Sequence, residues 1–254
     1  MKIVLFILAA LLLLLLLLIF YVKGNEGNSA KYSVRNMTPL ADSPLKGKTL
    51  IFLGSSVTVG AASGKEAVAD MIAHKHGANV IKEAVSGTTL TDKRSRYGGG
   101  RSYIDRMKDL DTHMHVDALI LQLSTNDATT GQPLGKIGDS RELSDFDTKT
   151  ILGAMEYIIA YARKTWHCPV LVYSGPDFHN ETYRQMNEAV KDLQKKWDIG
   201  FIDLFDDPDI NTRYITKEYM ADAAVKPIHP TKKGYQAWLP YFEKEIISVL
   251  SENE

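Results

Sequence analysis

This chain has very little cysteine and almost no net charge. Its single cysteine, Cys168, cannot form a disulfide within the chain. The 30 lysine and arginine residues nearly balance the 31 aspartate and glutamate residues, which leaves a formal net charge of −1. That balance leaves no excess of positive charge that would favour binding to nucleic acid. Internal repeats and low-complexity tracts are also missing, apart from one run of leucines, so the composition is that of an ordinary globular protein.

Sequence signals for a bound metal ion or phosphate group are weak. His74 and His76, and His113 and His115, form pairs two residues apart, but no group of cysteines and carboxylates accompanies them. Such pairs on polar segments are usually solvated. The glycine run at residues 98–100 lacks the GxxxxGK spacing of a phosphate loop and follows no predicted strand. We therefore expect neither a metal nor a cofactor.

The N-terminus carries a long apolar run. Residues 3–22 are uninterrupted by charge and include eight consecutive leucines. About twenty residues at roughly 1.5 Å each span about 30 Å, the thickness of a bilayer core. A signal peptide normally has a shorter apolar region and a small-residue cleavage site, which residues 19–23 do not offer. The run therefore favours one uncleaved N-terminal transmembrane helix, in residues 1–23, over a signal peptide.

The rest of the chain divides into a linker and one domain. Residues 24–47 are rich in glycine, asparagine, serine, proline and charge without apolar periodicity, which is typical of a tether. Residues 48–254 are enough for a single domain with a sizeable core. Lys2 favours a cytoplasmic N-terminus, although Lys23, Lys31 and Arg35 weaken that charge bias. We expect this domain to lie outside the cytoplasm.

Within the domain, short apolar runs alternate with segments of helical periodicity. Such runs suit strands that are buried on both faces, and the alternation predicts a mainly parallel five-stranded sheet between two layers of helices. The expected strands are residues 49–53, 79–84, 118–123, 170–174 and 200–204. The expected helices are residues 64–76, 103–110, 147–166, 181–197 and 232–250, the last with a cap at Thr231.

Polar segments with catalytic side chains lie at the ends of these elements. Gly54-Ser55-Ser56 follows the first strand, and Ser86-Gly87 follows the second. Asn126-Asp127 follows the third strand, and His229 precedes the last helix. Proteins with open α/β sheets have their binding and active sites at the carboxyl ends of the strands. A serine hydroxyl needs a base to attack an acyl carbonyl, and histidine suits that task near neutral pH. A separate Gly-Asp-Ser triplet, at residues 138–140, has no strand before it and is expected to be a decoy.

In this order, the four segments resemble the SGNH or GDSL hydrolase family of serine esterases over roughly residues 48–250. Residues 54–60 resemble the family's GDSxTxG block, and residues 124–127 its GxND block. The resemblance implies an SGNH/flavodoxin-like three-layer α/β/α sandwich. It also implies Ser56 as nucleophile, His229 as base, and an oxyanion hole made by the backbone N–H groups of Ser56 and Gly87 and the amide of Asn126.

Three positions depart from the family pattern. Ser55 stands where the family has aspartate, and Ser124 where it has glycine. Lys226 stands three residues before the histidine, where the family has the acid that orients the ring, and lysine cannot accept the imidazole N–H bond. Either Asp222 reaches the ring from four residues further upstream, or a backbone carbonyl fixes the tautomer and leaves a dyad of Ser56 and His229.

These residues predict hydrolysis of carboxylic esters through an acyl-serine intermediate. O-Acyl or O-acetyl esters on extracytoplasmic glycans or lipids are the expected substrates. The alternatives are an O-acyltransferase of the same fold, or a membrane-anchored binding domain that has lost catalysis. Tyr97, Arg101 and Tyr103 are candidates for lining the substrate cleft.

Overall fold

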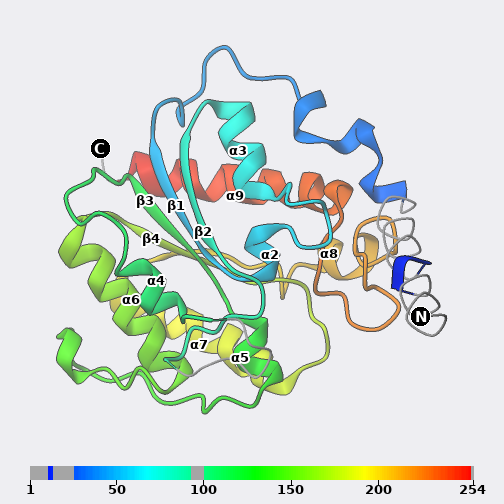
Figure 1. Ribbon diagram of the computed structural model, residues 1–254. Coiled ribbons are helices and arrows are strands. Elements are labelled where there is room, and N and C mark those ends of the chain that lie inside the picture. Colours follow the sequence, from blue (N-terminus) through cyan, green and yellow to red (C-terminus); the bar gives the residue numbers. More distant parts are fainter. Residues whose placement is uncertain (1–10, 14–25, 93–99, 253–254) are drawn as a thin grey trace, which may run out of the picture.

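The computed structural model describes residues 11–13, 26–92 and 100–252 (Figure 1). The predicted membrane span at residues 3–22 falls outside these ranges apart from residues 11–13, and Tyr97 also falls outside them. Among the residues described, no helix is both long enough and apolar enough to cross a bilayer. The transmembrane helix therefore stays a prediction.

Five parallel strands form the centre of the domain (Figure 1). They are β1 (Thr49–Gly54), β2 (Asn79–Ala84), β3 (Ala118–Gln122), β4 (Val170–Tyr173) and β5 (Gly200–Ile202), in the order β2-β1-β3-β4-β5. The predicted five-stranded parallel sheet is confirmed. The central strands β1 and β3 are buried almost throughout, whereas the edge strand β2 is only half-buried and carries Lys82 and Glu83.

Helices cover both faces of the sheet and enclose two apolar cores. One core lies beneath α3 (Val68–His76) and α9 (Lys232–Ser251). The other lies beneath α4 (Tyr103–Met107), α6 (Ile151–Thr165) and α7 (Glu181–Trp197). Thr231 caps α9 as expected, because its hydroxyl accepts the backbone N–H of Gly234. The layers therefore form the predicted α/β/α sandwich.

Three short helices were not predicted: α2 (Ser56–Val59), α5 (Thr125–Thr129) and α8 (Pro208–Arg213). Both α2 and α5 begin within three residues of a strand's end, at the same edge of the sheet. A helix of one turn is too short to show an apolar period in the sequence. These two helices carry the serine and the asparagine of the expected site.

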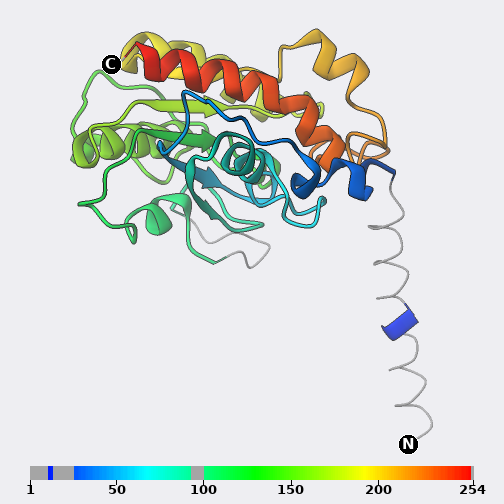
Figure 2. The ribbon, with the colours of Figure 1, turned by 90° about the horizontal axis from the view of Figure 1, so that it is seen from above.

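Residues 26–47 pack against the domain, in contrast to the tether expected for residues 24–47. Residues 26–36 form three 3-10 turns, η1 (Glu26–Asn28), η2 (Ala30–Tyr32) and η3 (Val34–Asn36). The first two lie beside the start of α9, and η3 contacts α3 (Figure 2). The Asn28 side chain accepts the backbone N–H of Lys232 at 3.0 Å and donates to the carbonyl of Ala62 at 2.8 Å. Polar bonds of this kind leave no apolar periodicity in a sequence, which is why composition alone suggested a linker.

Candidate active site

The turn after β1 presents Ser56 at the carboxyl edge of the sheet. Ser55 is the N-cap of α2 and Ser56 is its first residue. Gly54 allows this abrupt change from strand to helix, because a Cβ there would lie 1.8 Å from Thr58 Oγ1. The Ser56 backbone N–H belongs to the first turn of α2, where N–H groups have no partner within the helix. Ser56 itself is 7% exposed.

A buried amide from β3 fixes the shape of that turn. The Gln122 side-chain oxygen accepts the backbone N–H of Ser55 at 2.9 Å, the backbone N–H of Thr58 at 3.1 Å and the Thr58 hydroxyl at 2.7 Å. Its nitrogen donates to the Ser55 hydroxyl at 3.2 Å. The serine that replaces the family's aspartate therefore bonds to the same amide that accepts the N–H groups of the N-cap and of the third residue of α2.

The structure brings Ser56, His229 and Asp222 into one line of hydrogen bonds. Ser56 Oγ lies 2.9 Å from His229 Nε2, and His229 Nδ1 lies 2.7 Å from Asp222 Oδ2. The imidazole and the carboxylate are each about one third exposed. When Nδ1 carries the proton and donates it in a hydrogen bond to the carboxylate, Nε2 has a free lone pair and can take the serine proton.

Asp222 reaches the ring because the chain folds back on itself between residues 219 and 231. Met220 and Pro230 form an antiparallel bridge, and the Ala221 N–H donates to the His229 carbonyl at 2.9 Å. Asp222 Oδ1 accepts the backbone N–H groups of Ile228 and His229 at 3.1 and 2.9 Å, which leaves Oδ2 for the ring. Of the two arrangements that the sequence left open, the structure has the one in which the Asp222 carboxylate bonds to His229 Nδ1. Lys226 is exposed in the loop between them.

Asn126 contacts the loop after β2 that carries Gly87. Gly87 has a φ of +80°, a left-handed conformation that favours glycine. The Asn126 amide donates to the carbonyl of Thr88 at 2.8 Å. An amide nitrogen carries two donors, so this bond occupies one of them. The Ser124 hydroxyl caps α5 by accepting the Asp127 N–H, which gives this serine a use at the family's glycine position.

Asp127 is buried beneath the same loop. Its carboxylate accepts the backbone N–H groups of Leu90 and Thr91 at 2.7 and 3.2 Å and the Thr91 hydroxyl at 2.7 Å. Burial raises the pKa of this carboxyl, and the hydrogen bonds to it act in the opposite direction. Asn126 and Asp127, which are adjacent in α5, thus both bond to the loop that follows Gly87.

Other candidate groups lie apart from this line. Ser140, the expected decoy, is half-buried, lies on no strand and donates to Asp145. Cys168 is buried, and burial raises the pKa of its thiol to about 12, so it is not a competing nucleophile at neutral pH. Two expectations were wrong. His76 is buried between Ser43 and Glu243 instead of solvated, and Tyr103 is fully buried instead of lining a cleft.

Sequence reasoning missed the buried polar residues that support the site. Gln122 interrupts an otherwise apolar strand, and a polar residue there was a usable signal. Asp127 carries no signal in the sequence beyond its place next to Asn126. Arg106 lies in the short helix α4 and has no local signature, because its partners come from other elements.

Comparisons with known proteins agree with this geometry. The chain is similar to a solved protein from Lactobacillus plantarum, with 18% identity, a TM-score of 0.62 and coverage of 82% of this chain and 99% of that one. It is also similar to the M. smegmatis aryl esterase, with 17% identity, a TM-score of 0.55 and coverage of 80% and 100%. A family two carbohydrate esterase from Clostridium thermocellum, in complex with cellohexaose, matches with 17% identity, a TM-score of 0.58 and coverage of 84% and 67%. No curated protein gives a significant match. The model of the GDSL-like lipase/acylhydrolase family matches residues 52–237, well over half of the chain, so the chain belongs to this family of enzymes that act on ester bonds.

Proposed function

We propose that this enzyme hydrolyses carboxylic esters through an acyl intermediate on Ser56. The observation that carries the proposal is the unbroken line of hydrogen bonds from Asp222 through His229 to Ser56. A nucleophile, a base and a group that orients the base are the parts that acyl transfer needs.

The chemistry follows from this line. Ser56 Oγ attacks the ester carbonyl carbon while His229 Nε2 takes its proton, and Asp222 stays ionised and stabilises the imidazolium. The N–H groups of Ser56 and Gly87 and the Asn126 amide donate to the oxyanion. When the tetrahedral intermediate collapses, the bond to the alcohol oxygen breaks and the imidazolium protonates the departing alcohol. His229 then takes a proton from a water molecule that attacks the acyl-serine carbonyl carbon. The bond to Ser56 Oγ breaks, the imidazolium returns the proton to Oγ, and the acid is released.

Extracytoplasmic glycan or lipid esters are the proposed substrates. The support is the apolar N-terminal run and the likeness to a fold that also carries a carbohydrate esterase and an aryl esterase. An acceptor alcohol in place of water would make the same site an O-acyltransferase. A panel of p-nitrophenyl esters from acetyl to palmitoyl tests turnover and acyl length together, and addition of an acceptor alcohol separates hydrolysis from transfer.

A fluorophosphonate probe tests the nucleophile, because only an activated serine reacts with it. Ser56→Ala should abolish both labelling and ester hydrolysis, whereas Ser140→Ala, in the decoy triplet, should change neither. Labelling that persists in Ser56→Ala would overturn the assignment.

Asn126→Ala should lower kcat by roughly 10²–10³-fold with little change in KM, because an oxyanion donor acts on the transition state. A change confined to KM would instead assign Asn126 to substrate binding.

We also propose that residues 3–22 anchor the enzyme in a membrane with the domain outside the cytoplasm. The support is the length of the apolar run and the missing cleavage site. The intact chain should stay with membranes through carbonate washing. Recovery of an N-terminally trimmed protein from the medium alone would favour a signal peptide instead.

A further inference from the structure

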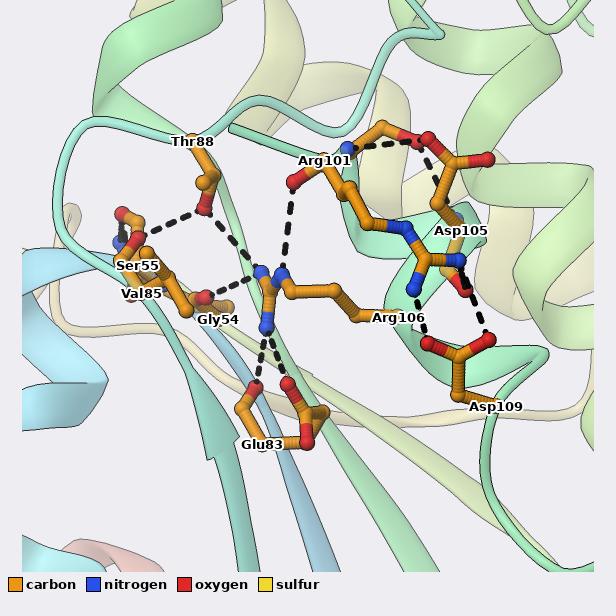
Figure 3. Close-up of polar contacts among 11 residues, drawn as sticks. Gly54, Ser55, Glu83, Val85, Thr88, Arg101, Asp105, Arg106 and Asp109 are labelled. Atoms are coloured by element: carbon orange, nitrogen blue, oxygen red, sulfur yellow. Dashed lines mark hydrogen bonds and ion pairs between the residues drawn. The ribbon is translucent and has the colours of Figure 1, made fainter. Parts of the chain in front are cut away.

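One buried arginine connects the segments that carry the proposed oxyanion hole (Figure 3). The Arg106 side chain is 7% exposed. A guanidinium has five N–H donors, and this one has an acceptor for each. The acceptors are the Arg101 carbonyl at 3.4 Å, the Glu83 carbonyl and carboxylate at 2.9 and 3.0 Å, the Gly54 carbonyl at 2.9 Å and the Thr88 hydroxyl at 3.1 Å.

Two of these acceptors lie within two residues of proposed oxyanion donors. Gly54 ends β1 two residues before Ser56, so its bond to Arg106 Nη2 fixes the start of the nucleophile turn. Thr88 directly follows Gly87, and the same nitrogen, Nη2, holds its hydroxyl. That hydroxyl also donates to the Val85 carbonyl at 2.7 Å, which closes the loop around Gly87.

Thr88 also links Arg106 to Asn126, the third proposed oxyanion donor. Its hydroxyl bonds to Arg106, and its carbonyl accepts the amide of Asn126 at 2.8 Å. Arg106 therefore contacts the segment before Ser56 and the residue after Gly87 directly, and it reaches Asn126 through Thr88. In Figure 3 its guanidinium lies between the labelled Gly54, Thr88 and Glu83.

Only arginine has the geometry for this arrangement. The planar fork reaches strands β1 and β2 and the loops at Thr88 and Arg101, whereas a lysine has three donors on one nitrogen and cannot span the same acceptors. We propose that Arg106 is a positioning residue that sets the mutual placement of the oxyanion donors on Ser56, Gly87 and Asn126. This inference rests on the proposed ester hydrolysis at Ser56.

The test is the steady-state hydrolysis of p-nitrophenyl acetate by Arg106→Met. We expect kcat to fall about 10²-fold with little change in KM, since a small misplacement of catalytic groups costs rate of this order. Arg106→Lys should be almost as slow. The plateau of the kcat–pH profile should drop without movement of its midpoint, because the His229–Asp222 pair is not touched. A shifted midpoint would overturn the proposal, since Arg106 would then act on the base through its charge.

A second variant keeps the test valid if Arg106→Met folds poorly. Thr88→Val keeps the shape of the side chain and removes the bridging hydroxyl, so it should lower kcat about tenfold, whereas Thr88→Ser should restore it. The double variant of Arg106→Met and Thr88→Val should lose little more than Arg106→Met alone, because both changes break one connection. Additive losses would contradict the shared role.

Arg163 offers a matched control. It is a partly buried arginine of α6 that donates to the Asp198 carbonyl, next to the start of β5 and away from the catalytic edge. Arg163→Met should leave kcat within about twofold of wild type. If Arg106→Met also keeps kcat within about twofold while wild type turns over and Ser56→Ala does not, the positioning role is refuted and the proposed function stands. If wild type shows no turnover, the proposed function itself fails.

Discussion

Asp222→Asn should inactivate the enzyme while leaving its fold intact. Asp222 uses its two oxygens separately: Oδ1 accepts two backbone N–H groups and Oδ2 faces His229 Nδ1. An asparagine can keep the first oxygen as its amide oxygen and place its NH₂ group where Oδ2 was. That NH₂ group is a donor, so Nδ1 must become the acceptor and the ring proton must move to Nε2. A protonated Nε2 cannot take the proton of Ser56.

By analogy with other serine triads, the inverted tautomer should lower kcat about 10⁴-fold, or about 5.4 kcal/mol at roughly 1.36 kcal/mol per tenfold. Because the backbone bonds to Oδ1 survive, the free energy of unfolding should change by less than about 1 kcal/mol, or roughly 2–4 °C in Tm. Asp222→Ala is the matched comparison. It removes both sets of bonds and should lower activity and Tm together.

The assay is p-nitrophenyl acetate hydrolysis at pH 8 combined with thermal unfolding of the same samples. A kcat within tenfold of wild type in Asp222→Asn would refute the reasoning and leave the dyad of Ser56 and His229. Equal losses of Tm in the asparagine and alanine variants would show that the carboxylate mainly holds the loop.

Three further results are expected. Lys226→Asp, which restores the family's acid position, should leave kcat within about twofold of wild type because Asp222 already occupies Nδ1; a clear gain in kcat would show that Asp222 is a poor orienting group. Burial raises the pKa of Glu66, but hydrogen bonds from Lys232 and from the η2–η3 segment outweigh it and hold this pKa below its ordinary value of 4.5. The stabilisation from Glu66 is therefore present above about pH 4.5 and is lost as the pH falls through the lower folded-state pKa, so Glu66→Gln should flatten the acid limb of the Tm–pH curve. Gln122→Leu leaves buried N–H groups of the nucleophile turn without an acceptor and should lower the urea-derived free energy of unfolding by about 2–4 kcal/mol; an unchanged value would show that the turn relaxes.

The layers of the fold could be predicted because burial leaves a local pattern. Each strand needed a short apolar run, and the helices of nine residues or more repeat their apolar positions, so α7 was predicted with its bounds from Glu181 to Trp197. The packing of residues 26–36 could not be predicted, because it depends on bonds to Glu66 and Lys232, which are distant in the sequence.

The residues of the site also differ in whether the sequence could predict them. Ser56 and His229 follow from motifs next to predicted elements. Asp222 remained one of two choices, because its contact depends on the bridge between Met220 and Pro230, which only the folded chain forms. Arg106 could not be found at all, since its meaning depends on the two loops that meet around it.

If the enzyme is anchored by residues 3–22, the packed segment at residues 26–36 limits how far the active site can lie from the membrane. Asn28 bonds both to the loop after the nucleophile helix and to the start of α9, two residues beyond Pro230, so this segment is fixed close to the catalytic edge. Between residue 22 and residue 26 the chain extends at most about 14 Å. If residues 3–22 span a bilayer, only these few residues link the membrane to the domain. The catalytic serine would then stay close to the membrane surface. Esters on lipid headgroups or on the innermost layer of a glycan would be within reach, and more distant ones would come into range only when flexible residues are inserted between positions 22 and 26.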